Sequence, residues 1–259
     1  MDELQTAPAV YWENRFMKVL IVSFVMAYPV TTGNGARIAS LTSALESLGH
    51  DIVFAYVPYY PSDYTSDDCY LMKGRLGSKL RILRAGSPPF PRLIHRIQRK
   101  IARVFGSKSA YRWSVDEWFD DGLVSQVQKL HADEHFDAVL IEYVLLSKLA
   151  TALPGSVRTI IDAHDVMGDR HIRFLQTGLM PGWFTTSPTR EISALNRANA
   201  VIAIQEEEAS YFRQNLSADV FCVGHLFGPE VSPLPDPGAL ASCSWVPRIR
   251  SMPRVLNGL

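Results

Sequence analysis

The sequence has few cysteines and no long apolar segment. Its 259 residues include three cysteines, Cys69, Cys222 and Cys243, which are too few and too scattered for a disulfide framework, and no Cys-x-x-Cys pair is present to bind zinc. The longest apolar run, residues 19–30, has twelve positions, whereas a transmembrane helix needs about twenty. These absences favour a reducing, cytoplasmic compartment and argue against a membrane span.

The chain also has no net charge, because 26 Lys and Arg balance 26 Asp and Glu. The charges are nevertheless segregated, since residues 73–112 contain twelve basic residues and no acidic ones. Residues 92–105 have the period of a basic amphipathic helix, whose basic positions are Arg92, Arg96, Arg99, Lys100 and Arg103. Two interpretations stay open: this helix lies on an anionic membrane surface, or it packs its apolar side inward and exposes a solvated charged face. No nucleic-acid-binding motif accompanies the charge.

Short apolar runs alternate with helix-like periods along most of the chain. We expect strands over residues 18–24, 52–57, 81–84, 136–142, 157–161, 200–204 and 220–223, and helices over 38–48, 92–105, 116–131, 147–153, 190–196 and 206–215. Near-continuous apolar strands are typical of a sheet with both faces covered. The pattern predicts an α/β fold with a Rossmann-like, doubly wound parallel sheet, in which ligands bind at the carboxyl ends of the strands.

A glycine-containing loop, with Gly33 and Gly35, follows the first predicted strand. It does not match a dinucleotide-binding fingerprint, because Ile38 stands at the third glycine position and residues 57–58 offer no acidic side chain for a ribose. The glycines let the backbone approach an anion at a helix N-terminus, and Arg37 supplies a charge there. The alternative is an ordinary turn without a ligand.

Polar residues also follow later predicted strands. Glu142 ends one strand, His164 and Asp165 follow the next, and Glu206 follows another. No spacing among these residues resembles a known metal motif, so no metal is expected. The His164 imidazole can hydrogen-bond a substrate hydroxyl through either nitrogen, or it can be a structural histidine.

Together these segments resemble the glycosyltransferase family 4 (group 1) enzymes of the GT-B fold. The resemblance covers roughly residues 17–228 and is carried by the segments at 17–23, 33–37, 45–53, 136–143, 162–165 and 198–209. Two departures from the family pattern are Gln205, where the family often has serine, and residues 223–226, where it usually has an interdomain turn.

The resemblance implies the N-terminal, acceptor-side lobe of a retaining hexosyltransferase. It implies that Gly33 and Gly35 line the cleft between lobes, that His164 contacts the transferred sugar or the acceptor, and that Glu142 contacts the acceptor. We expect Arg37, Asp165 and Glu206 to contribute to substrate binding. A nucleotide sugar is the donor in this family, and no further cofactor or metal is expected. The partners implied are a glycan or lipid-linked acceptor, a separate donor lobe and an anionic membrane surface, as in polysaccharide or glycoconjugate biosynthesis.

We expect three segments in the chain. Residues 1–16 form a non-domain extension, residues 17–228 form the Rossmann-like domain, and residues 229–259 form an irregular tail. A shifted reading frame near residue 240 is our hypothesis for the tail, because back-translation in another frame gives a sequence resembling the start of a second lobe. On this hypothesis the chain is truncated and inactive alone. The alternative function is a non-catalytic Rossmann-like module that binds a small anion or a protein partner.

Overall fold

The computed structural model describes residues 16–58, 66–84, 97, 99–102, 104–105, 107–181 and 184–226. Most of the predicted front extension, residues 1–15, and the predicted tail lie outside the described residues. The strands are β1 (Lys18–Ser23), β2 (Asp51–Tyr56), β3 (Leu80–Ile82), β4 (Ala138–Glu142), β5 (Arg158–Asp162), β6 (Ala200–Ala203) and β7 (Asp219–Cys222). The α-helices are α1 (Gly33–Ser47), α2 (Asp67–Leu76), α4 (Gly122–Glu134), α5 (Arg170–Gln176), α6 (Pro188–Leu195) and α7 (Glu206–Asn215). The 3-10 helices are η2 (Gly77–Lys79), η3 (Lys108–Tyr111), η4 (Val115–Trp118) and η5 (Val144–Ala152).

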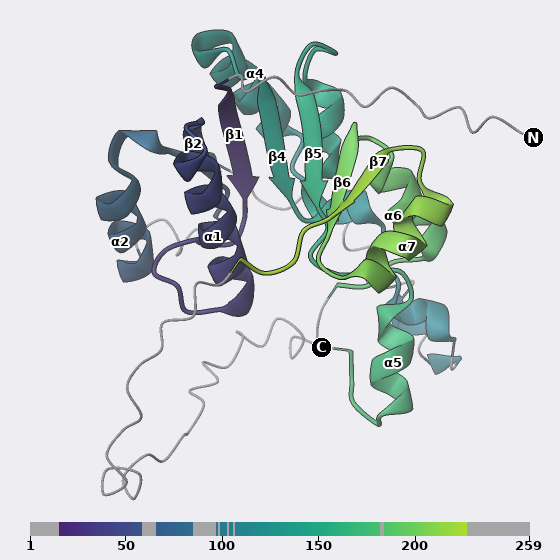
Figure 1. Cartoon of the computed structure of the whole chain (residues 1–259). Helices are drawn as coiled ribbons and strands as arrows, with labels where there is room; N and C mark the ends of the chain where they lie inside the picture. Colours follow the sequence, from purple (N-terminus) through teal and green to yellow (C-terminus); the bar gives the residue numbers. More distant parts are fainter. Residues whose placement is uncertain are drawn as a thin grey trace, which may run out of the picture. The chain divides into compact units, whose positions relative to one another are not determined.

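The strands form one seven-stranded sheet in the order β3-β2-β1-β4-β5-β6-β7. Every neighbouring pair is parallel. The chain moves outward from β1 to β3 and then returns to place β4 on the other side of β1 (Figure 1). This reversal is the topological switch point of a doubly wound sheet, and the predicted fold class is confirmed.

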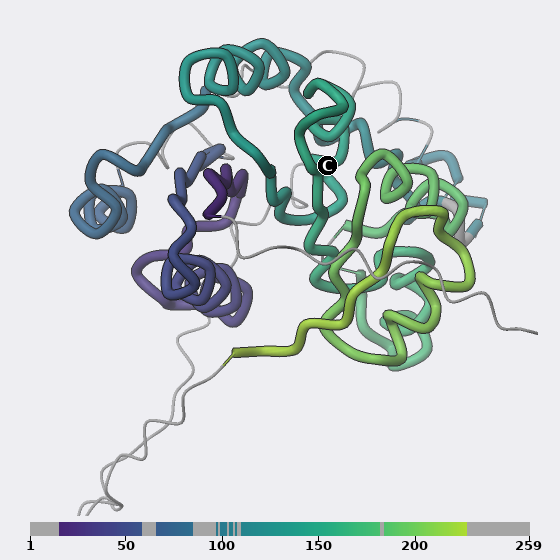
Figure 2. The backbone as a smooth tube through the Cα atoms, turned by 45° about the horizontal axis from the view of Figure 1, so that its top comes forward, coloured from purple at the N-terminus to yellow at the C-terminus, as the bar shows by residue number. Residues whose placement is uncertain are grey.

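Two apolar cores cover the two faces of the sheet. One core packs α1 and α2 against alternate strand residues, as shown by Ile21, Ile38 and Met72. The other packs α4, η5, α6 and α7 against the opposite face, and includes Leu123 and Phe212. Figure 2 shows α1 and α4 on opposite sides of β1. Because successive strand side chains point to opposite faces, the apolar runs predicted for the strands serve both cores.

α1 begins earlier than its apolar period predicted. Thr32 is the N-cap, and its hydroxyl accepts a hydrogen bond from the Gly35 N–H at 3.2 Å, which satisfies one of the free donors of the first turn. The glycines therefore form the first turn of the helix rather than a separate loop. Gly49, with a φ of 90°, follows the Leu48 C-cap at the end of the helix.

The sequence analysis did not predict two of the helices, and one helix that it predicted is divided in the structure. α2 and α5 both lie in segments for which no helix was expected. The predicted helix over 116–131 is split into η4 and α4. No helix among the described stretches is long and apolar enough to cross a membrane.

The expected orientation of the basic helix is wrong at Arg99. Its guanidinium lies 3.3 Å from the ring centroid of Trp113 and bonds to Glu117 at 2.8 Å, so the side chain is buried rather than solvent-facing. Conversely, Ile101 is 52% exposed and Phe105 is 82% exposed. Lys100 is exposed as expected. The side chains of Arg92, Arg96 and Arg103 lie outside the described residues.

Candidate functional site

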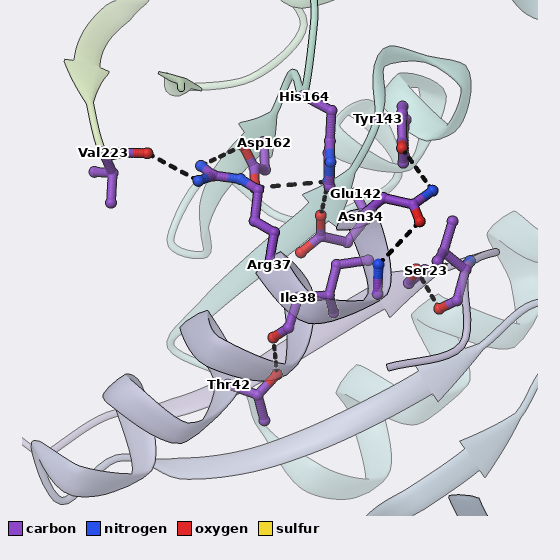
Figure 3. A network of polar contacts seen from close by, with 12 residues as sticks. Ser23, Asn34, Arg37, Ile38, Thr42, Glu142, Tyr143, Asp162, His164 and Val223 are labelled. Atoms are coloured by element: carbon purple, nitrogen blue, oxygen red, sulfur yellow. Dashed lines mark hydrogen bonds and ion pairs between the residues drawn. The ribbon is translucent and has the colours of Figure 1, made fainter. Parts of the chain in front are cut away.

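A buried polar cluster lies at the carboxyl ends of β4 and β5, beside the switch point. Glu142 and Asp162 end these strands and are register partners in the sheet. The first turns of α1 bring Asn34 and Arg37 to the same edge, and His164 follows β5 by two residues (Figure 3). Three of the predicted site residues, Arg37, Glu142 and His164, are thus brought together as the strand-end argument requires.

Glu142 and His164 form the closest polar pair in the cluster. Glu142 Oε2 and His164 Nε2 are 2.6 Å apart, and the two side chains are 0% and 4% exposed. Burial raises the pKa of Glu142 to about 7 against the lowering effect of the His164 hydrogen bond, and the nearby Asp162 carboxylate raises it further. The other Glu142 carboxyl oxygen, Oε1, is buried with no hydrogen-bond partner. The Glu142 carboxyl group therefore takes up or releases its proton near neutral pH, and it lies too deep to contact an acceptor directly.

Arg37 and Asp162 form a second buried pair. Arg37 Nε and Nη2 donate to the two carboxylate oxygens of Asp162 at 2.7 and 2.9 Å. Arg37 Nη1 donates to the carbonyl oxygens of Val223 and Gly224 at 2.9 and 3.1 Å (Figure 3). Because every nitrogen of the guanidinium is bonded within the protein, Arg37 is not available for the substrate contact expected from the sequence.

Tyr143 and His164 carry backbone strain next to this cluster. Their φ angles are 69° and 59°, in the region that residues with a side chain rarely adopt. Their rings stack with centroids 4.0 Å apart and planes 5° apart, and Asn34 donates to the Tyr143 hydroxyl at 3.0 Å. Burial raises the pKa of Tyr143 to about 12, so its hydroxyl stays protonated. These contacts fix the plane of the imidazole.

Glu142, Asp162 and His164 place their polar atoms within 4.8 Å of one another, close enough to be considered for a metal ion. Two ligands about 2.1 Å from a tetrahedral zinc ion lie about 3.4 Å apart, whereas Glu142 Oε2 and His164 Nε2 are 2.6 Å apart. Asp162 also already has the full positive charge of Arg37 at 2.7 Å. This geometry fits a shared proton and does not fit a metal.

The two glycines at the start of α1 differ in their surroundings. A Cβ added at Gly35 would lie 2.8 Å from the Met26 carbonyl oxygen and 2.9 Å from Thr32 Oγ1, whereas one added at Gly33 would meet nothing within 4 Å. Gly35 is therefore required by packing. Gly33 is exposed and borders open space at the cluster's edge of the sheet.

The structure does not bring the other two predicted residues into the cluster. Asp165 forms an ion pair with Arg170 at 3.0 Å, and Glu206 is exposed and forms an ion pair with Arg213 at the start of α7. The loop after His164 is held instead by Glu191, whose carboxylate accepts the Met167 and Gly168 N–H groups at 2.6 and 2.7 Å. Burial raises the pKa of Glu191 to about 7.

The sequence analysis did not place Asn34, Tyr143 or Glu191 in the site. Tyr143 directly follows a predicted strand, so its position at the strand end is a signal in the sequence. Asn34 and Glu191 carry no comparable signal, because their roles depend on segments distant in the sequence: 109 residues separate Asn34 from Tyr143, and 24 separate Glu191 from Met167.

Comparison with known proteins gives structural similarity only. No protein-family model matches the chain, and no curated protein matches it in sequence. Solved structures similar to it include sucrose-phosphate synthase from Thermosynechococcus elongatus, with a TM-score of 0.48 and 14% identity over 80% of this chain and 48% of that chain. Another is Arabidopsis thaliana UGT89C1 complexed with UDP-L-rhamnose, with a TM-score of 0.44 and 15% identity over 89% of this chain and 55% of that chain. The chain thus spans about half the length of these proteins.

Proposed function

We propose that this chain is the acceptor-binding lobe of a retaining glycosyltransferase of family 4. The sequence resemblance supports the family, and the observation that carries the site is the strained, stacked Tyr143–His164 pair beside Glu142 at the ends of β4 and β5. Strained residues of this kind cluster at functional sites, because the surrounding structure must stabilise them. The proposed acceptor is a glycan or lipid-linked saccharide.

His164 is the residue assigned to contact the acceptor or the transferred sugar. Its Nε2 faces Glu142, which leaves Nδ1 as the ring nitrogen for a sugar hydroxyl. The open space beside Gly33 provides an approach to this edge of the sheet. The donor is a nucleotide sugar bound by a separate lobe, so we expect almost no transfer by this chain alone.

Saccharide binding by the purified chain tests this proposal. We expect a hit on an array of glycans and lipid-linked saccharides, and His164→Ala should weaken that binding about tenfold, the effect of losing one well-placed hydrogen bond. Tyr211→Phe, an α7 change outside the cluster, is the matched control and should leave binding unchanged.

Three results would count against this proposal. Saccharide binding that is unchanged in His164→Ala would show that His164 does not contact the acceptor. Binding of inorganic phosphate or a peptide without any saccharide would favour the alternative, a non-catalytic module for a small anion or a protein partner. Sugar transfer by the isolated chain would contradict the requirement for a donor lobe.

Membrane association at the cytoplasmic face is a second part of the proposal. It is supported by exposed apolar residues on the helical segment around residues 97–105, which include Ile97, Ile101, Val104 and Phe105, within a stretch that has no acidic residue from 73 to 112. An apolar stripe flanked by basic residues is typical of an interfacial helix. This surface differs from the one expected from the sequence, because Arg99 lies inward.

A further inference from the structure

Arg37 joins the polar cluster to the segment that leaves the sheet after β7. This exit segment, residues 223–226, begins where the Val223 N–H donates to the Ala203 carbonyl at 2.9 Å. Its first two carbonyl oxygens, those of Val223 and Gly224, accept hydrogen bonds from Arg37 Nη1. The sequence separations are 186 and 187 residues, so Arg37 is a long-range tie between α1 and the end of the described chain.

The Arg37 guanidinium also contacts Asp162, which in turn lies beside the Glu142–His164 pair. Asp162 Oδ2 accepts from Arg37 Nε at 2.7 Å and lies 3.6 Å from His164 Nε2, which is 2.6 Å from Glu142. An unbroken polar path therefore runs from the exit-segment carbonyls through Arg37 and Asp162 to the pair (Figure 3).

Two charged groups act on the pair, and each comes from a different element. Arg37 comes from α1 and Asp162 from β5, and they respectively lower and raise the pKa of Glu142. The Tyr143 hydroxyl follows β4 and stays protonated, with Arg170 of α5 acting on that hydroxyl. A proton added to the pair brings positive charge closer to Arg37 and draws the Asp162 carboxylate toward the pair. Both effects weaken the two hydrogen bonds from Arg37 to Asp162, which orient the guanidinium.

We propose that Arg37 couples docking of the exit segment to protonation of the Glu142–His164 pair. Protonation loosens the exit segment, and release of the segment favours protonation. The two effects have the same magnitude, because coupling between two equilibria is reciprocal. A ligand or partner that displaces the exit segment thereby changes the proton affinity of the Glu142–His164 pair. This inference goes beyond the proposed function and does not depend on it.

Amide hydrogen exchange of the purified chain tests the coupling. Protection factors for residues 219–226, corrected for the intrinsic pH dependence of exchange, are measured between pH 6 and pH 8. We expect protection in the unmodified chain to fall about tenfold as the pH is lowered, within the range of ordinary coupling. Glu142→Gln should abolish this pH dependence, and Arg37→Gln should lower protection at every pH.

Arg197→Gln is the matched control. Arg197 also forms a two-bond pair with an aspartate, Asp116, at 2.6 and 2.9 Å, and none of its hydrogen bonds reaches the exit segment. This variant should keep the pH dependence of the unmodified chain. An identical pH dependence in the unmodified chain and in Glu142→Gln would overturn the proposal.

A second measurement keeps the test decisive if Glu142→Gln fails to fold. The carboxyl carbon of Glu142 is followed by NMR as a function of pH in the unmodified chain and in Arg37→Gln. Because Arg37 lowers the pKa of Glu142, the titration midpoint should move to higher pH in the variant. An unchanged titration midpoint of Glu142 in Arg37→Gln would show that Arg37 holds the exit segment without affecting protonation of the pair.

Discussion

Replacing Arg37 with methionine tests how strongly the buried cluster depends on charge pairing. Arg37 is 2% exposed and Asp162 is 0% exposed, so the substitution leaves a carboxylate that water cannot reach. Its remaining partner, His164 Nε2, lies 3.6 Å away. Breaking a buried pair by removing one partner costs about 3–5 kcal/mol of unfolding free energy. Val223 and Gly224 add little to this cost, since both residues are partly or fully exposed and water can replace the lost donor.

Urea unfolding followed by circular dichroism measures this loss, and two further variants separate charge from packing. Arg37→Met combined with Asp162→Leu should recover all but about 1–2 kcal/mol, because removing both partners leaves no stranded charge. Arg197→Met should cost about 1 kcal/mol at most, because its ion pair with Asp116 is 23% and 35% exposed. A double variant no more stable than Arg37→Met would refute the reasoning, as would an Arg37→Met cost below about 1 kcal/mol.

Three other predictions concern separate parts of the chain. Gly35→Ala should cost about 1–3 kcal/mol in urea unfolding, because its Cβ would lie 2.8 Å from the Met26 carbonyl, whereas Gly33→Ala should stay within about 0.5 kcal/mol; equal effects would contradict the packing argument. The pKa of Glu191 is raised from 4.5 to about 7 in the folded chain, so the folded state binds more protons and stability should fall as pH rises from about 4.5 to 7. Glu191→Gln should abolish about 3 kcal/mol of that loss of stability, and an unchanged pH dependence would show that other groups produce it. Phe105→Asp should reduce co-sedimentation with anionic vesicles about tenfold, and binding that ignores this change or the salt concentration would reject the membrane surface.

The central strands were predictable because they are buried on both faces, as β1 and β4 are. Residues 19–22 and 138–141 are continuous apolar runs, and they lie in the adjacent strands β1 and β4. The strand-end argument then placed Glu142 and His164 at one edge of the sheet. Helix boundaries were less accurate where capping rather than apolar period decides them, as at Thr32.

The orientation of charged side chains was not predictable from period alone. A helical period identifies two faces of residues 92–105 but does not say which face turns inward. Trp113 and Glu117, which follow that segment, pair with Arg99 and draw it into the protein. The aromatic face and the carboxylate compensate the burial of the guanidinium, so the usual rule that arginines stay exposed does not decide this position.

The orientation of Arg37 at the candidate site was also not predictable from the sequence, and it changes which ligands the site can bind. One turn into a helix beside a glycine loop, an arginine is expected to meet an anionic ligand. Instead, Asp162 and the exit-segment carbonyls occupy all three of its nitrogens. The positive charge thus neutralises the Asp162 carboxylate of the protein, while burial raises the pKa of Glu142 to about 7 beside His164. With its arginine already paired, the cluster offers no free cation to an anionic ligand, which agrees with the neutral, hydroxyl-bearing acceptor that we propose for His164.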